Sequence, residues 1–342
     1  MFKYNFINTT KKKILINIQR AFFSFNLNEP LLLKFCYFIY LLFGYNKITL
    51  FLLKHSLKKM SSVTDINHFI KIASLHSNNN FKNFHDLAFD YKKKIFFNSE
   101  QKIPSLSNKK SNQMEFEQGK FKTYIDDLIQ KGYCEVTDLL NLDSSQINNF
   151  VNTVFKIKAY NSQVVLQSNC QKVEINNSYN YFSFDPGEPG LKSYYKIIVQ
   201  NKSLSDIINS YLKFEAQLYS INTMVSLQNQ HKHFVTNIHR DYDDIHFLAL
   251  FVYWTDVNAN NGATSVIPGS HLNNNRDLKS LKFLSGKPGS AFLVDTFAEH
   301  SGNKELLTPR VTTWFRFGRP LNHASYVDKN YLFLNYYKSL YF

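Results

Sequence analysis

A tripeptide in the last third of the chain joins two side chains that bind transition metals. His239 and Asp241 stand one residue apart in the stretch Asn-Ile-His-Arg-Asp, residues 237–241. In an extended strand alternate side chains point to the same face, so the imidazole and the carboxylate would lie together while Arg240 points away. One strand can therefore supply two ligands of a metal ion.

A third ligand must come from another strand, and His300 is the candidate. It follows His239 by 61 residues, which is enough for several antiparallel strands and their turns. Two imidazoles and one carboxylate on one side of a metal form the ligand set of a mononuclear non-haem iron site, and they leave positions open for other ligands. Taken singly these residues are weak evidence, because the chain has 11 His and a lone His is more often a hydrogen-bonded structural residue.

The segment around the two histidines carries further motifs in a fixed order. Trp254-Thr-Asp256 ends an apolar run, Asn261-Gly-Ala-Thr-Ser-Val-Ile-Pro-Gly-Ser-His271 follows it, and Arg310 stands 10 residues after His300. With these motifs in this order, the sequence resembles the phytanoyl-CoA dioxygenase family of iron- and 2-oxoglutarate-dependent oxygenases. The resemblance is specific from about Tyr219 to Gly318 and weaker from about Gln118 onward, and the first hundred residues have no part in it.

The resemblance implies an enzyme that uses iron(II), 2-oxoglutarate and dioxygen. The two histidines and Asp241 would hold the metal. Arg310 would bind the distal carboxylate of 2-oxoglutarate, because a planar guanidinium can donate two parallel hydrogen bonds and a Lys cannot. By the same resemblance Trp254 and Met224 line the cosubstrate pocket, and ordinary core packing is the alternative for both.

Three more residues are candidates for contact with the cosubstrate or the substrate: Ser301, Asp243 and His246. Ser301 directly follows the distal histidine, although the family pattern places a hydroxyl one position later, where this chain has Gly302. Asp243 and His246 closely follow the metal-binding tripeptide, and the alternative is that both are solvated loop residues.

The activity that the resemblance implies is hydroxylation of a small organic or lipid-like substrate, with 2-oxoglutarate decarboxylated to succinate and CO2. One alternative is a non-catalytic jelly-roll binding module, although such a protein would be expected to have lost a ligand or the arginine. Another is a nucleic-acid-directed oxygenase, since Arg310 and Arg316 fit part of the signature R-x-N-x-T-x-R. Thr312 and Trp314 depart from that signature, and the basic residues lie outside the catalytic part, so we expect no nucleic-acid partner. A halogenase would need a small residue in place of Asp241.

The surrounding elements predict a mainly β domain with flanking helices. Apolar residues recur with helical spacing over 121–129, and Asp143-Ser-Ser-Gln146 resembles a capping box that begins another helix. Strand-like runs follow at 218–227, 245–254, 263–267, 290–295 and 308–317. Several short strands without intervening helices indicate a sandwich or jelly roll. We expect a double-stranded β-helix (jelly-roll, cupin-like) core with the three metal ligands at its open mouth.

The first part of the chain is strongly basic. Residues 1–60 hold ten Lys or Arg and one acid, in a chain whose formal net charge is +14. Their apolar runs, 31–44 and 48–53, are shorter than the roughly 20 residues that span a bilayer, so interfacial or packed helices are favoured over a transmembrane helix. We expect a cytoplasmic protein with peripheral membrane contact through this segment. The three Cys lack metal-ligand spacing and fit a reducing compartment.

These observations divide the chain into three parts. We expect residues 1–113 to form a basic, partly apolar N-terminal extension with helices and a linker, within which 61–113 is polar and irregular. Residues 114–320 form the dioxygenase domain, and 321–342 form an aromatic-rich tail that packs on it.

Overall fold

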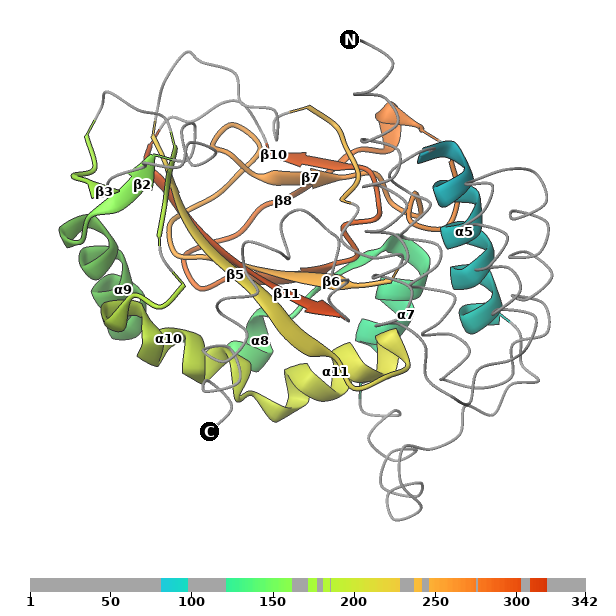
Figure 1. Ribbon diagram of the computed structural model, residues 1–342, viewed down its shortest axis with the longest axis horizontal. Coiled ribbons are helices and arrows are strands. Elements are labelled where there is room, and N and C mark those ends of the chain that lie inside the picture. Colours follow the sequence, from blue (N-terminus) through green and yellow to red (C-terminus); the bar gives the residue numbers. More distant parts are fainter. Residues whose placement is uncertain are drawn as a thin grey trace, which may run out of the picture. The chain divides into compact units, whose positions relative to one another are not determined.

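The computed structural model describes residues 81–97, 121–161, 172–176, 181–184, 186–227, 237–241, 246–274, 276–302 and 308–318 (Figure 1). The chain divides into two compact units, Met1–Pro104 and Ser105–Phe342. The apolar runs before residue 81 and the tail 321–342 lie outside the described residues. Within the described parts of the chain, no helix is long and apolar enough to cross a membrane.

The described part of the first unit is a helix, α5 (Phe81–Phe97). The polar sequence of this stretch predicts irregular structure, and that prediction is wrong for residues 81–97. Ala88, Phe89 and Lys92 are buried and lie on one side of the helix. A buried lysine within the apolar stripe hides the helical period, which explains the error.

The sequence predicts two of the helices of the second unit, those that begin at Lys122 and Ser144. The helices of this unit are α7 (Lys122–Lys131), α8 (Thr137–Leu140), α9 (Ser144–Lys156), α10 (Pro189–Val199) and α11 (Lys202–Leu212). Gly132 ends α7 with a φ of 82°, a left-handed conformation that glycine adopts without strain. At the start of α9 the Asp143 side chain accepts from the Gln146 backbone, and the Gln146 side chain accepts from the Asp143 backbone. The predicted capping box is therefore confirmed.

The strands form two antiparallel sheets. The large sheet has the order β1-β9-β6-β11-β5-β4-β2-β3 and the small sheet the order β10-β7-β8. Their bounds are β1 (Tyr133–Glu135), β2 (Ala159–Asn161), β3 (Lys172–Val173), β4 (Tyr181–Ser183), β5 (Gln217–Ser226), β6 (Leu248–Tyr253), β7 (Thr264–Val266), β8 (Lys282–Leu284), β9 (Ala291–Val294), β10 (His300–Gly302) and β11 (Arg310–Gly318). A short 3-10 helix, Leu278–Ser280, precedes β8.

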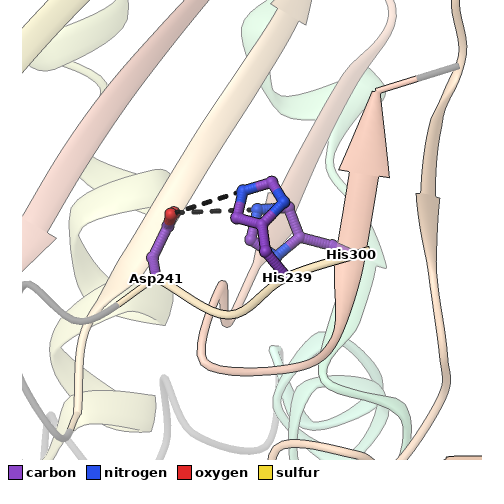
Figure 2. Close-up of side chains that lie close together, drawn as sticks. All are labelled: His239, Asp241 and His300. Carbon is purple, nitrogen blue, oxygen red and sulfur yellow. Dashed lines mark ion pairs between the residues drawn. The ribbon is translucent and has the colours of Figure 1, made fainter. Parts of the chain in front are cut away.

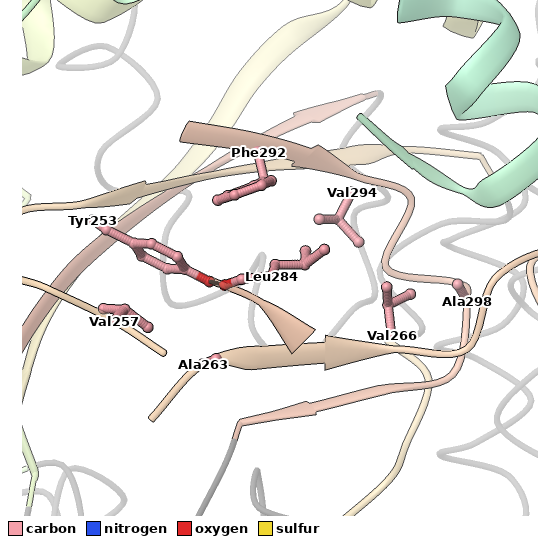
Figure 3. Close-up of a cluster of buried hydrophobic side chains, with 8 residues drawn as sticks. All are labelled: Tyr253, Val257, Ala263, Val266, Leu284, Phe292, Val294 and Ala298. Atoms are coloured by element: carbon pink, nitrogen blue, oxygen red, sulfur yellow. Dashed lines mark hydrogen bonds between the residues drawn. The ribbon is translucent and has the colours of Figure 1, made fainter. Parts of the chain in front are cut away.

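The two sheets pack face to face over a hydrophobic cluster (Figure 3). Tyr253, Phe292 and Val294 come from the large sheet, and Val266 and Leu284 come from the small sheet. Figure 1 shows α9, α10 and α11 along the other face of the large sheet. Two antiparallel sheets that share one core, with helices outside, confirm the predicted mainly β, jelly-roll fold.

The strand register decides which side chains of β11 point into the space between the sheets. Thr312 pairs with Tyr253, which belongs to the hydrophobic cluster between the sheets. Trp314 pairs with Phe251, which packs against that cluster. Paired residues share a face and alternate residues of a strand share a face, so Arg310 and Arg316 also point inward. We call this side of the large sheet the inner face. Residues 311, 313 and 315 point to the helices.

Candidate metal centre

Backbone pairing places the two histidines next to each other. The His239 N–H donates to the His300 carbonyl at 2.9 Å, and the His300 N–H donates to the His239 carbonyl at 2.9 Å. The Asp241 N–H donates to the Thr296 carbonyl at 2.9 Å, which holds Asp241 against the segment before β10. Residues 239–241 thus extend the small sheet beyond β10, because His239 and His300 form an antiparallel bridge. Directly paired residues share a face, so both imidazoles point the same way.

The three predicted ligands converge (Figure 2). The Nε2 atoms of His239 and His300 lie 3.7 Å from Oδ1 and from Oδ2 of Asp241, respectively. One ligand atom from each residue lies within 4.8 Å of the other two, and no other such group of His, Cys, Asp or Glu occurs in the described ranges. The imidazole planes are tilted by 48° with their centroids 4.4 Å apart, so neither ring covers the other's nitrogen. Ligand atoms arranged in this way can share a single ion.

The second nitrogen of each ring fixes the tautomer. Nδ1 of His239 lies 2.8 Å from the Asn237 carbonyl oxygen, and Nδ1 of His300 lies 3.0 Å from the Ala298 carbonyl oxygen. A carbonyl oxygen only accepts, so each Nδ1 must carry the hydrogen. Each Nε2 is left with its lone pair directed at Asp241, which is the state that a metal requires of an imidazole.

Electrostatics keep both kinds of ligand in the protonation state that binds a metal. Burial lowers the pKa of His300 to about 4, although the charge of Asp241 acts in the opposite direction. Burial would raise the pKa of Asp241, but the charges of Arg316, His300 and His239 outweigh it and hold this pKa below its ordinary value. At neutral pH the site therefore offers a neutral imidazole and an ionised carboxylate.

Arg310 is a buried cation without an acidic partner among the residues that the structure describes. Its side chain begins β11 on the inner face, and the residue is 7% exposed. One guanidinium nitrogen donates to the Gly262 carbonyl, a second lies 3.4 Å from Ser226 Oγ, and Nε has no hydrogen-bond partner. Burial lowers the pKa of this arginine, which measures the cost of holding a charge there.

The two residues predicted to line the cosubstrate pocket lie on opposite sides of the large sheet. Met224 pairs with Thr312 and therefore shares the inner face with Arg310. Trp254 lies on the helix-facing side, where its ring stacks on Phe150 with centroids 3.6 Å apart and its Nε1 donates to Thr313 Oγ1 at 2.9 Å. The structure thus gives Trp254 the alternative role, that of a core residue.

Of the other three candidates, Ser301 and His246 contact residues other than the metal ligands. Ser301 alternates with His300 and points to the opposite face of the small sheet, where its hydroxyl lies 2.8 Å from Ser265 Oγ. His246 is fully buried, with its ring 5.1 Å from that of Tyr211. Asp243 lies outside the described residues.

Two arginines near the site receive no role from the sequence. Arg316 places Nη2 at 3.1 Å from Asp241 Oδ2. Arg316 follows Arg310 by six residues on one strand, so the two side chains share a face. This even spacing is the feature of the sequence that could have identified Arg316. Arg240 points away from the site as predicted, and it donates to the carbonyls of Ser270 and Phe297 at 2.6 Å each. It therefore ties residues 239–241 to the turn that follows β7 and to the turn that precedes β10.

Two histidines and one carboxylate on the inner side of a jelly roll are a donor set that suits a mononuclear non-haem iron ion. Residues 199–292 match the model of the phytanoyl-CoA dioxygenase (PhyH) family. This match agrees with the resemblance that the sequence shows, which implies an enzyme that uses iron(II), 2-oxoglutarate and dioxygen. The match includes His239 and Asp241, whereas His300 and Arg310 lie beyond its end.

Among solved structures, several iron- and 2-oxoglutarate-dependent proteins are similar in fold. SnoN, a non-haem α-ketoglutarate-dependent epimerase from nogalamycin biosynthesis, has 12% identity and a TM-score of 0.42 over 61% of this chain and 89% of its own. EctD from S. alaskensis with bound Fe has 15% identity and a TM-score of 0.41 over 57% and 75%. HygX from Streptomyces hygroscopicus, with nickel, 2-oxoglutarate and hygromycin B bound, has 10% identity and a TM-score of 0.41 over 58% and 86%. A comparison with curated proteins found no match.

Proposed function

We propose that the protein hydroxylates a small organic substrate, and that His239, Asp241 and His300 bind the iron(II) that this reaction needs. The observation that carries the proposal is the donor set itself: two Nε2 lone pairs and a carboxylate that converge within 4.8 Å. Both imidazoles are oriented by backbone carbonyls, as metal-binding histidines usually are. Three protein ligands leave positions open for 2-oxoglutarate and dioxygen.

Arg310 is the residue that we assign to 2-oxoglutarate. A buried guanidinium without an acidic partner is costly, and an anionic ligand would compensate it. On the same inner face Thr312 Oγ1 and Asn222 Oδ1 are buried without hydrogen-bond partners among the described residues. Such atoms cost roughly 1–3 kcal/mol each when they stay unpaired, so their presence supports a polar ligand on this face.

The residues around the centre have separate tasks in the proposed reaction. Iron(II), when bound, supplies the activation of dioxygen that is coupled to decarboxylation of 2-oxoglutarate to succinate and CO2. Arg310 would anchor the distal carboxylate, and the neutral imidazoles and ionised Asp241 would hold the metal. The hydrophobic cluster between the sheets includes Val266, which pairs with His300, so the interior beside the centre is apolar there.

Metal analysis tests the assignment. Purified wild type loaded with iron(II) under anaerobic conditions should bind one equivalent, and His239→Ala and His300→Ala should each lose most of it, because two remaining donors bind iron(II) weakly. His85→Ala, which changes a histidine of the first unit, is the matched control and should bind as wild type does. Iron retained near the wild-type level in both site variants would rule out this ligand set. Formation of succinate from 2-oxoglutarate by the wild type is the test of the activity.

A further inference from the structure

The contact between Arg316 and Asp241 has no role in the proposed function so far. Arg316 lies on β11 and points to the inner face, with 12% of its side chain exposed. Its Nη2 lies 3.1 Å from Oδ2 of Asp241, which is a hydrogen-bonded ion pair. Asp241 has 16% of its side chain exposed, so the pair is largely shielded from solvent. A long side chain from the large sheet thus reaches a carboxylate carried by the small sheet.

We propose that Arg316 is a positioning residue that holds one oxygen of Asp241 and so leaves the other oxygen as the single donor to the metal. The proposal rests on the proposed function, because it assumes that Asp241 is a ligand. A carboxylate can bind a metal through one oxygen or through both. An oxygen engaged by a guanidinium is less available to the metal.

The number of coordination positions explains why this matters. With one oxygen from Asp241, the protein would supply three donors to iron(II), and room would remain for a 2-oxo acid that binds through two atoms and for dioxygen. With both oxygens bound, the protein would supply a further donor, and less room would remain for the 2-oxo acid and dioxygen together. Arg316 would therefore act on cosubstrate binding more than on iron binding.

A purely structural role for Arg316 makes a different prediction. Asp241 is largely buried, and an arginine could be present only to neutralise it. In that case the loss of Arg316 would lower the stability of the metal-free protein, and any effect on iron and 2-oxoglutarate would be equal. The positioning role instead predicts that 2-oxoglutarate affinity falls while iron affinity is largely kept.

The experiment compares full-length wild type, Arg316→Met, Arg316→Lys and the control Arg276→Met. Arg276 is a useful match because it also pairs with a carboxylate, Glu299, at 2.9 Å, but has 53% of its side chain exposed. Each protein is titrated anaerobically with iron(II) and then with 2-oxoglutarate. The visible charge-transfer absorption of the 2-oxo acid chelated to iron(II) is recorded, and thermal unfolding of the metal-free proteins is measured alongside.

For Arg316→Met we expect an iron(II) Kd within about tenfold of wild type and a 2-oxoglutarate Kd raised by about 10- to 100-fold, with a weakened charge-transfer band. Arg316→Lys should recover part of the affinity and of the band, because an ammonium can still engage one oxygen. Arg276→Met should match wild type. If Arg316→Met does not fold, Arg316→Lys decides alone, and a wild-type 2-oxoglutarate Kd in that variant overturns the proposal.

Two other outcomes also overturn it: an unchanged 2-oxoglutarate Kd in Arg316→Met, or a loss of iron(II) affinity as large as the loss of 2-oxoglutarate affinity. Failure of the proposed function would look different. The wild type itself would then bind no iron(II), or would bind iron(II) but no 2-oxoglutarate, and the assignment of Asp241 as a ligand would fail together with the role of Arg316.

Discussion

Replacing Arg310 by Met should separate cosubstrate binding from folding. The guanidinium is 7% exposed, its contact to Ser226 Oγ is long at 3.4 Å, and no acid among the described residues balances it. In the presence of 2-oxoglutarate, removing one partner of a buried charge pair costs about 2–5 kcal/mol. That cost corresponds to a Kd raised by a factor of about 30 to several thousand. Arg310→Lys should fall between wild type and Arg310→Met, because the charge returns without the two-pronged geometry.

The effect on stability should be small or of opposite sign. A buried cation pays a desolvation cost of several kcal/mol, whereas its hydrogen bond to the Gly262 carbonyl returns only about 1.5–3 kcal/mol. The metal-free Arg310→Met protein should therefore be at least as stable as wild type, within about 1 kcal/mol. In contrast, 2-oxoglutarate added to the iron-loaded proteins should raise the unfolding temperature of wild type and not that of the variant.

The assay is an anaerobic titration of the iron-loaded proteins with 2-oxoglutarate, together with thermal unfolding with and without it. Arg276→Met serves as the control for loss of an arginine, since that side chain is half exposed. Equal dissociation constants for wild type, Arg310→Lys and Arg310→Met would refute the assigned role. A large loss of stability in the metal-free variant, with 2-oxoglutarate binding unchanged, would show that Arg310 is a structural residue.

Three further predictions address the surroundings of the site. Below about pH 6.5 a histidine of the unfolded chain gains a proton, whereas His300 in the folded protein stays neutral until about pH 4. The free energy of unfolding of the metal-free protein should therefore fall by up to about 3 kcal/mol between these pH values. Urea unfolding should show a smaller fall for His300→Gln than for wild type, and equal falls would contradict the prediction. Trp254→Phe should lower the free energy of unfolding by about 1–2 kcal/mol, because the hydrogen bond to Thr313 is lost, and should leave the 2-oxoglutarate Kd unchanged. A raised Kd would show that Trp254 lines the cosubstrate pocket. A truncated chain that begins at Asn112 should keep succinate formation and lose binding to anionic vesicles; a chain that does not fold, or still binds them, would disprove this.

Much of the metal centre could be predicted from the sequence because its geometry is local. Strand alternation alone places His239 and Asp241 on one face and Arg240 on the other, and the structure has them so. The capping box at Asp143 and the C-cap at Gly132 are likewise local signals, since each depends on residues within one turn of a helix. The longer strands, β5, β6 and β11, are long enough for their apolar pattern to be recognised.

What the sequence did not determine is which face of the large sheet a given residue occupies. Trp254 follows β6 directly, and whether it points to the interior or to the helices depends on packing with Phe150, more than 100 residues earlier in the chain. The predicted contact of Ser301 with the cosubstrate or substrate also depends on strand pairing. Because His300 pairs with His239, the next side chain points to the opposite face. The three-residue strands β8 and β10 are too short to show a period, so their pairing is visible only in the structure.

The fold assigns the two sheets different tasks at the centre. The small sheet and its extension at 239–241 carry all three proposed metal ligands, and backbone hydrogen bonds between 239–241 and 296–300 fix their spacing. The large sheet supplies the two inward arginines from one strand, β11. Ligands set by backbone pairing tolerate changes in neighbouring side chains, whereas arginines that reach across the interior depend on how the sheets pack. Mutations in the hydrophobic cluster that joins the sheets should for this reason disturb 2-oxoglutarate binding before they disturb iron binding.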